Sequence, residues 1–436
     1  MPRPVPAHGD PRTAWLHQPT GNGSVDITIE FLLIRFYRGI NAVTDLERFK
    51  AICNFEKPDY VPIFGIPGSS GMSGGLMRFG WERLVEQGMP DWVDGCVSLD
   101  DPRSRREFKT WHRYWGTTGP VTVDFFPGDP AAGVASTKRT EGDREIIEYE
   151  TGALTRQVID NDVTYSMPDY VIHHVKDRKT WTFYRDRATP GKPWSSELLD
   201  HECRRFDRRD RPLSLGIGGT WGRLRGLMGP AAACTVLYDD PNLAHEIIEW
   251  YAWLFERYMI PVIERLKPEL VGTGEDCCYN HGMLVSPAQF EHFCGDYYRK
   301  VSEVCRDNGV TMIHIDTDGN AMEFTGLARS FGMNAIHPYE VKAGNDLFSL
   351  REQYSDFILM GWLEKECVNE GNDKLIADEI LGKVPLLLES GGYFPNGDHG
   401  LQPLVTFESM CKFMTLLHDV CGNPEGEFPR VKLEAG

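Results

Sequence analysis

The 436-residue chain lacks a long hydrophobic run and lacks a surplus of positive charge. A membrane-spanning helix needs about 18 or more consecutive apolar residues, and no segment approaches that length. The formal net charge is -18 at pH 7. Because nucleic acids and anionic membranes bind basic surfaces, this charge excludes both as expected partners. The N-terminal segment also lacks the apolar core of a signal peptide, so we expect a cytoplasmic protein.

The cysteines lack the spacing of a disulfide framework and form no CxxC pair. Eleven cysteines lie at irregular intervals, and Cys277 and Cys278 are adjacent. In a large chain without a secretion signal, such cysteines are mostly small buried hydrophobic residues. Apolar side chains are abundant instead: hydrophobic residues make up 41% and aromatic residues 11% of the chain. This composition predicts a large folded core rather than disorder.

The chain is predicted to have a short extension and one folded unit. Residues 1–40 are rich in Pro, Gly and His, and we expect an N-terminal extension there, ahead of a single unit over 41–436. The first helix of this unit is expected to begin near Thr44, because Thr44 and Glu47 have the spacing of a capping box. The mixed segment 105–190 is interpreted as an insertion within the unit that contains a small β-ribbon.

Later in the chain, apolar strand patterns alternate with helix patterns. The segments predicted as strands are 60–65, 212–219, 269–276, 311–316, 334–340, 357–362 and 384–392. Long helices are predicted between them at 239–266 and 286–309. Strands that alternate with helices indicate parallel βαβ units. No Gly-x-Gly-x-x-Gly turn follows a strand, so the pattern favours an α/β fold of the TIM-type (β/α)8 barrel class over a dinucleotide-binding sheet.

The C-terminal ends of the predicted strands are rich in side chains that bind metals. Such ends form the active site of a (β/α)8 barrel. The acidic and histidine residues there are Glu275, Asp276, His314, Asp316, His337, Glu340, Asp398 and His399. His314 and Asp316 are two residues apart on one strand, so their side chains share a face. Carboxylates and imidazoles from separate strands suit a metal site, and nitrogen-plus-oxygen ligation fits zinc.

Most of these residues also have a structural interpretation. Glu275 and Asp276 are suited to capping the turn that follows, and Asp318 to forming an Asx turn. His314 is compatible with a core histidine, but Asp316 on the same face favours a ligand role, because a buried carboxylate needs a cation or hydrogen-bond donors. For His337 and Glu340, structural roles in their strand and loop remain open.

Several segments of the chain resemble the uroporphyrinogen decarboxylase superfamily. The matching segments are RFKAICNFEKPDYVPIF, MPDYVIHHVKDRKTW, DDPNLAHEIIEW, SPAQFEHFCGDYYRKV and the stretch from HIDTDGN through AIHPYE to MGW. The resemblance runs from about residue 44 to the end and implies a single (β/α)8 barrel. True decarboxylases carry an Arg- and Gly-rich loop after the first strand, whereas the loop GIPGSSGMSGGLMRFG contains Arg78 alone. The resemblance therefore favours the cobalamin-dependent methyltransferase branch.

The resemblance also implies a metal site. Coenzyme M members of that branch bind zinc through a His-x-Cys pair and a late Cys. The corresponding positions here are His314, Asp316 and His399, so both thiolates are replaced. A harder donor set makes zinc a stronger Lewis acid, which favours a methoxylated aromatic compound, an alcohol or an amine as methyl donor over a thiol. Glu275 or Glu340 is then expected as the fourth ligand or as the acid that protonates the leaving oxygen.

The remaining expectations concern the substrate pocket and the partners. The residues expected to line the pocket are Phe125, Phe126, Tyr165, Trp221 and His337. The chain lacks a corrinoid-binding Asp-x-His-x-x-Gly motif, so the corrinoid is expected on a separate carrier protein. A homodimer is left open. Two other functions also remain open: a metal-free decarboxylase or lyase that acts on a smaller acid, and a non-catalytic barrel that binds a small molecule.

Overall fold

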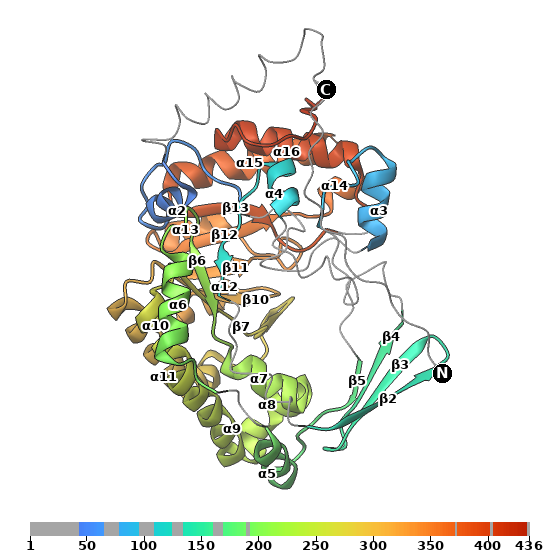
Figure 1. The fold of residues 1–436 in the computed structure, drawn as a ribbon, viewed down its shortest axis with the longest axis vertical. Coiled ribbons are helices and arrows are strands. Elements are labelled where there is room, and N and C mark those ends of the chain that lie inside the picture. The colour runs from blue at the N-terminus through green and yellow to red at the C-terminus, as the bar shows by residue number, and fades with distance from the viewer. Residues whose placement is uncertain are drawn as a thin grey trace, which may run out of the picture. The chain divides into compact units, whose positions relative to one another are not determined.

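The described part of the chain covers most of the folded unit in a computed structural model (Figure 1). It comprises residues 43–64, 78–95, 109–123, 134–159, 169–188, 192–370, 373–401 and 404–433. The chain divides between Val43 and Thr44, and Thr44–Gly436 forms one unit. The expected extension 1–40 and the pocket residues Phe125, Phe126 and Tyr165 lie outside the described residues.

Seven parallel strands form the central sheet. In spatial order they are β1 (Val121–Thr122), β6 (Leu213–Gly216), β7 (Leu270–Gly274), β10 (Met312–Thr317), β11 (Ala335–Pro338), β12 (Ile358–Leu363) and β13 (Tyr393–Gly397). The spatial order follows the chain order, as it does when each strand is followed by a helix that returns the chain to the same end. Phe64 adds an eighth position through a parallel bridge to Thr118. The Phe64 ring also contacts Phe394 of β13, with centroids 5.4 Å apart. The expected (β/α)8 barrel class is therefore confirmed.

The two faces of the strands bury different clusters. The interior face belongs to a small apolar cluster that contains Phe49, Ile52, Phe64, Leu270, Met312, Ala335, Ile358, Met360 and Phe394. The alternate residues Ile313, Ile315, Ile336 and Leu359 belong to the large cluster shared with the surrounding helices. Because Phe49 and Ile52 come from α2 (Asp45–Cys53), this helix closes the N-terminal end of the barrel. The opposite end, where the strands finish, carries the polar residues.

Two of the helices begin at the capping residues expected from the sequence. Further helices are α3 (Arg78–Glu86), α4 (Lys109–Trp115), α5 (Arg178–Arg187), α6 (Ser196–Phe206), α7 (Thr220–Met228), α8 (Pro230–Asp239), α11 (Pro287–Asp307), α12 (Met322–Ser330), α13 (Leu347–Gln353), α14 (Cys367–Glu370) and α16 (Phe407–Cys421). The capping box of Thr44 and Glu47 forms as predicted. Ser286 caps α11 by accepting from the backbone N–H of Gln289. No helix among the described residues is long and apolar enough to cross a membrane.

The helix predicted at 239–266 is interrupted. It consists of α9 (Pro241–Leu254), a π-helical turn η3 (Phe255–Met259) and α10 (Ile260–Leu266). Pro261 lies two residues after the end of the π turn and has no N–H to donate. A π turn is one of the ways in which a helix absorbs such a missing hydrogen bond.

The strand predicted at 384–392 is wrong. This segment is the second half of α15 (Asp373–Ser390), which continues through Pro385, and the strand β13 begins only at Tyr393. Ile376, Ile380, Val384 and Leu387 are buried at helical spacing. Packing of this face outweighs the helix-breaking effect of the proline. Figure 1 shows α15 and α16 packed side by side, in orange and red.

The insertion is a four-stranded antiparallel sheet. Its strands are β2 (Ser136–Glu141), β3 (Arg144–Tyr149), β4 (Leu154–Val158) and β5 (Asp169–Ile172), paired in chain order. The expected β-rich insertion is confirmed. However, β1 falls within the predicted range 105–190 and pairs with β6 in the barrel sheet, so the inserted sheet begins after β1.

Candidate functional site

The site lies at the C-terminal end of the barrel, where the chain leaves four of five adjacent strands. Asp276 follows β7, Asp318 follows β10, Glu340 follows β11 and His399 follows β13. Parallel pairing brings these ends to one edge: Asp316 of β10 is in register with Gly274 of β7 and with His337 of β11. The polar residues therefore meet because the strands are parallel and in register, as in other barrels of this type.

Two groups of side chains converge there. The ligand atoms of Asp318, Glu340 and His399 all lie within 4.8 Å of one another, and so do those of Asp276, Asp316 and Asp318. We call the first group the histidine set and the second the carboxylate set. Asp318 belongs to both, so the two sets form one continuous cluster. Within the described ranges, these are the two such groups of three or more potential metal ligands.

His399 and Asp318 are coupled in the histidine set. The Nε2 atom of His399 lies 3.6 Å from Oδ2 of Asp318, and its Nδ1 accepts a hydrogen bond of 2.9 Å from the backbone N–H of Gly400. The bond to Asp318 raises the pKa of His399 against the effect of burial. Burial raises the pKa of Asp318, but the contact with His399, together with the positive charges of His337 and Arg225, holds this pKa below its usual value. Since Nδ1 is occupied, Nε2 is the atom that faces the set and can bind a metal.

The histidine set is held in place by buried hydrogen bonds. Glu340 accepts a bond of 2.7 Å from the backbone N–H of Gly319. Asp398 is fully buried and accepts from the backbone N–H groups of Val341, at 2.9 Å, and Lys365, at 3.1 Å. Asp398 thereby ties together the loops that follow β11, β12 and β13. Two of these loops carry Glu340 and His399.

Two histidines stand in the barrel interior below the cluster. His337 is fully buried, and its Nδ1 lies 3.2 Å from Oδ2 of Asp316. The Nε2 atom of His337 and the Nδ1 atom of His314 are buried without a hydrogen-bond partner. The His314 ring packs against Gly272 of β7, where a Cβ atom would overlap it. Burial lowers the pKa of His314 to about 4, so this side chain is neutral at pH 7.

The three metal ligands predicted from the sequence do not form one group. His399 lies in the histidine set, Asp316 lies in the carboxylate set, and His314 is in neither. The structure adds Asp318, which the sequence pattern assigned to a turn. Asp318 is two residues beyond Asp316, so the same alternation that joined His314 to Asp316 was the signal that could have found it.

Glu275 is placed differently from Glu340. It is buried, and its carboxylate accepts from the backbone N–H groups of Trp221 and Gly222 at the start of α7, and from the hydroxyl of Tyr298. Burial raises the pKa of Glu275 to about 8, against the effect of the backbone donors. Its oxygens are therefore engaged at the N-terminus of α7, where a helix favours an acceptor. Of the two acids proposed from the sequence, Glu340 is the one that faces the histidine set.

The predicted pocket residue Trp221 lies in the hydrophobic core with 1% of its surface exposed. Room exists elsewhere in the barrel. A Cβ atom at Gly274, which is in register with Asp316, or at Gly216 at the end of β6 would meet nothing within 4 Å. The end of β7 thus leaves open space next to Asp316.

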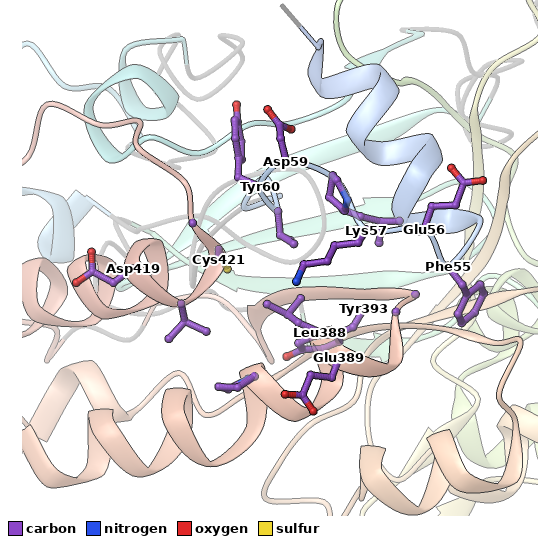
Figure 2. Close-up of a pocket in the computed structure, with 18 residues that line it drawn as sticks. Phe55, Glu56, Lys57, Asp59, Tyr60, Leu388, Glu389, Tyr393, Asp419 and Cys421 are labelled. Atoms are coloured by element: carbon purple, nitrogen blue, oxygen red, sulfur yellow. The ribbon is translucent and has the colours of Figure 1, made fainter.

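A separate pocket of about 520 Å³ lies at the other end of the barrel (Figure 2). Its lining comes from the segment after α2, the end of α15, the start of β13 and the end of α16. Figure 2 shows the Lys57 side chain extending between Tyr60 and Tyr393. Tyr393 begins β13, whereas His399 lies beyond its end. The N-terminal end of a barrel contributes to stability rather than to catalysis, so this pocket is not the active site.

The fold and the cluster define a (β/α)8 barrel with a polar site at the C-terminal ends of its strands. The family model for uroporphyrinogen decarboxylase (URO-D) matches residues 203–420, which is half of the chain. The chain belongs to the uroporphyrinogen decarboxylase family.

Comparison with solved structures adds a relative in fold. A methyltransferase from Methanosarcina mazei superposes with a TM-score of 0.53 at 14% sequence identity, over 87% of this chain and 98% of that chain. At this identity the likeness shows a shared fold. No curated protein matches the chain.

Proposed function

We propose that this protein is a zinc-dependent methyltransferase. The observation that carries the proposal is the histidine set, which lies at the catalytic end of a barrel with the fold of a methyltransferase. Asp318, Glu340 and His399 offer one nitrogen and two carboxylates within 4.8 Å of one another. Three such ligands with a fourth open position are typical of catalytic zinc. When bound, zinc would act as a Lewis acid on the oxygen or nitrogen that carries the methyl group.

The chain's own residues would hold and shape this site. His399 would bind through Nε2, because Nδ1 is engaged by Gly400. Asp398 would keep Glu340 and His399 in place by fixing the loops that carry them. Asp316 would orient His337 beside the site. This replaces the ligand set proposed from the sequence, in which His314 and Asp316 joined His399.

The methyl acceptor would be a corrinoid on a separate carrier protein in the cytoplasm. The sequence has no Asp-x-His-x-x-Gly motif, and the surface is acidic rather than suited to nucleic acid. In the transfer, the bond from the donor's oxygen or nitrogen to the methyl carbon breaks, and its electron pair stays with the leaving group. The methyl carbon takes an electron pair from the reduced cobalt, and the leaving group takes a proton.

The test is methyl transfer by the purified full chain. The protein is loaded with zinc and mixed with reduced cob(I)alamin, or with a corrinoid carrier protein, and with methanol, methylamines or methoxylated aromatics as donors. Formation of methylcobalamin is followed by absorbance. The expected result is turnover that disappears in the His399→Ala variant and persists in a His281→Ala variant, which changes an exposed loop histidine.

Absence of methylcobalamin with every donor would overturn the proposal. Release of carbon dioxide from a small organic acid by metal-free protein would instead support the decarboxylase alternative. Ligand binding without turnover would support the non-catalytic barrel.

A further inference from the structure

The pocket at the N-terminal end of the barrel has the size and the lining of a small-molecule site. Its volume is about 520 Å³, and ligand pockets commonly have volumes of about 300–1,000 Å³. Ile52, Tyr393 and Cys421 form buried parts of its lining. Pro385 and Leu388 of α15 add half-buried apolar surface. An occupant of this pocket would therefore contact mostly apolar side chains.

Phe55 bounds one end of the pocket in a conformation that aromatic residues rarely adopt. Its φ is 61°, at the position after the C-cap of α2 where a helix usually carries glycine. Its ring packs against Gly392 so closely that a Cβ atom there would lie 2.3 Å from it. The guanidinium of Arg351 covers the ring at 5.2 Å from the centroid. Strained residues of this kind concentrate at functional sites, so Phe55 is evidence for a ligand site rather than a packing defect.

Lys57 brings a positive charge into this apolar pocket. It is the one basic side chain among the 18 described residues of the lining. Figure 2 shows its side chain extending into the pocket between Tyr60 and Tyr393. The hydroxyl of Tyr60 is engaged outside the lining by Asp45, and that of Tyr393 by the carbonyl oxygen of Gly361. The ammonium group of Lys57 is therefore the polar group that an occupant would meet.

The carboxylates of the lining do not neutralise this ammonium group. They belong to Glu56, Asp59, Glu389 and Asp419. Asp59 accepts hydrogen bonds of 2.7 and 2.8 Å from Arg48, and Figure 2 shows the carboxylates of Glu56 and Glu389 pointing away from Lys57. Over the described ranges, Lys57 has no ion-pair partner. Four nearby carboxylates disfavour a ligand with several negative charges, whereas one ammonium group favours a ligand with a single negative charge.

We propose that this pocket binds a small monocarboxylate with an apolar body. The carboxylate would accept a charge-assisted hydrogen bond from Lys57, and the body would lie against Phe55 and Leu388. The site is distinct from the histidine set, because Tyr393 begins β13 and His399 lies beyond its end. The inference does not depend on the proposed methyl transfer.

Three probes that share a phenyl ring and differ in charge test the assignment. Binding of benzoate, benzamide and phenyl phosphate to the full chain is measured by calorimetry. A chelator is present, so that no probe can bind through zinc. Benzoate is expected to bind about tenfold more tightly than benzamide, the effect of about one charge-assisted hydrogen bond. Phenyl phosphate is expected to bind more weakly than benzoate, and added salt to reduce the benzoate preference.

Matched variants assign the preference to this pocket. Lys57→Met keeps most of the side-chain stem and is expected to lower the affinity for benzoate to that for benzamide. Lys179→Met changes an exposed lysine of α5 and should leave both affinities unchanged. Phe55→Gly suits the left-handed backbone and removes the ring, so it should weaken both ligands to a similar extent. Thermal unfolding of each variant checks that the barrel is intact.

Four results would overturn the inference. They are the absence of saturable binding of all three probes, equal binding of benzoate and benzamide, a preference that survives in Lys57→Met, and a benzoate affinity that depends on His399 instead of Lys57. The last result, measured with His399→Ala, would place the carboxylate at the other end of the barrel.

Discussion

The Asp318 carboxylate lies 3.6 Å from Nε2 of His399 and joins the loop after β10 to the loop after β13. The contact links the two ends of a run of four adjacent strands across the barrel mouth. It places a nitrogen and an oxygen donor where zinc can replace the shared proton. Asp318→Ala and His399→Ala are each expected to weaken zinc binding about tenfold or more, because each removes one donor of the set.

The measurement for these variants is zinc content after competition with a chelator. His314→Ala is expected to keep its zinc, because His314 lies outside the histidine set. Loss of zinc in His314→Ala, with retention in Asp318→Ala, would restore the ligand set proposed from the sequence.

Asp398 acts as a positioning residue for the same site. Replacing it by Asn removes one acceptor for the backbone N–H groups of Val341 and Lys365, and so loosens the loops of Glu340 and His399. Zinc affinity is expected to fall about 10–100-fold, as it does when groups that orient metal ligands are changed. Competition titration measures the affinity, and the visible absorption spectrum of the cobalt-substituted protein reports ligand geometry. Unchanged affinity and geometry would show that Asp398 has no positioning role.

Glu275 is expected to contribute to stability rather than to catalysis. In Glu275→Ala, the N–H groups of Trp221 and Gly222 and the hydroxyl of Tyr298 lose their acceptor inside the barrel wall. The free energy of unfolding should fall by about 1–3 kcal/mol, the cost of leaving such buried groups unpaired. Urea unfolding measures the change. Glu249→Ala, at an exposed position of α9, serves as control, and it should leave stability nearly unchanged. A Glu275→Gln variant with full stability and lost turnover would instead make Glu275 an acid.

Two glycines of the same region provide a matched pair. A Cβ atom at Gly219 would overlap the Glu275 carboxylate and lie 2.6 Å from the carbonyl oxygen of Gly274. Gly219→Ala is therefore expected to destabilise the protein. Gly226 lies within α7, and a Cβ atom there would meet nothing within 4 Å. Gly226→Ala should raise stability by up to about 1 kcal/mol through helix propensity. Thermal unfolding of both variants checks the difference.

Acid should destabilise the fold through its buried histidines. Burial lowers the pKa of His112 and of His314 to about 4, from 6.5 in an unfolded chain. As the pH falls from about 6.5 towards 4, the unfolded chain binds protons that the folded chain does not. Each histidine should therefore reduce stability by about 1.4 kcal/mol per pH unit in this range.

The measurement is urea unfolding of metal-free protein at several pH values. His112→Gln should reduce the slope of the unfolding free energy against pH by the contribution of one histidine. His201→Gln, at an exposed position, should leave this slope unchanged. An identical slope in His112→Gln and in the unaltered protein would contradict this prediction.

The sequence determined the barrel and the end at which its polar groups gather. Alternating apolar segments of strand and helix length allow few arrangements, and the strand-end positions of Asp316 and Glu340 follow directly from that pattern. The helix caps at Thr44 and Ser286 could also be predicted from the sequence, because a cap depends only on residues close to it along the chain. The same reasoning was wrong for the apolar segment 384–392, because the burial of Val384 and Leu387 keeps that segment helical through Pro385.

The tertiary structure decided which of these groups meet. Strand alternation puts His314 and Asp316 on one face, but His314 lies deeper in the barrel and does not belong to the group that contains His399. Asp318, two residues beyond Asp316, does contact His399. Glu275 and Asp276 are neighbours in sequence, yet one turns into the wall to cap α7 and the other faces the site. These choices depend on distances between segments far apart in the chain, which the spacing along any one segment does not determine.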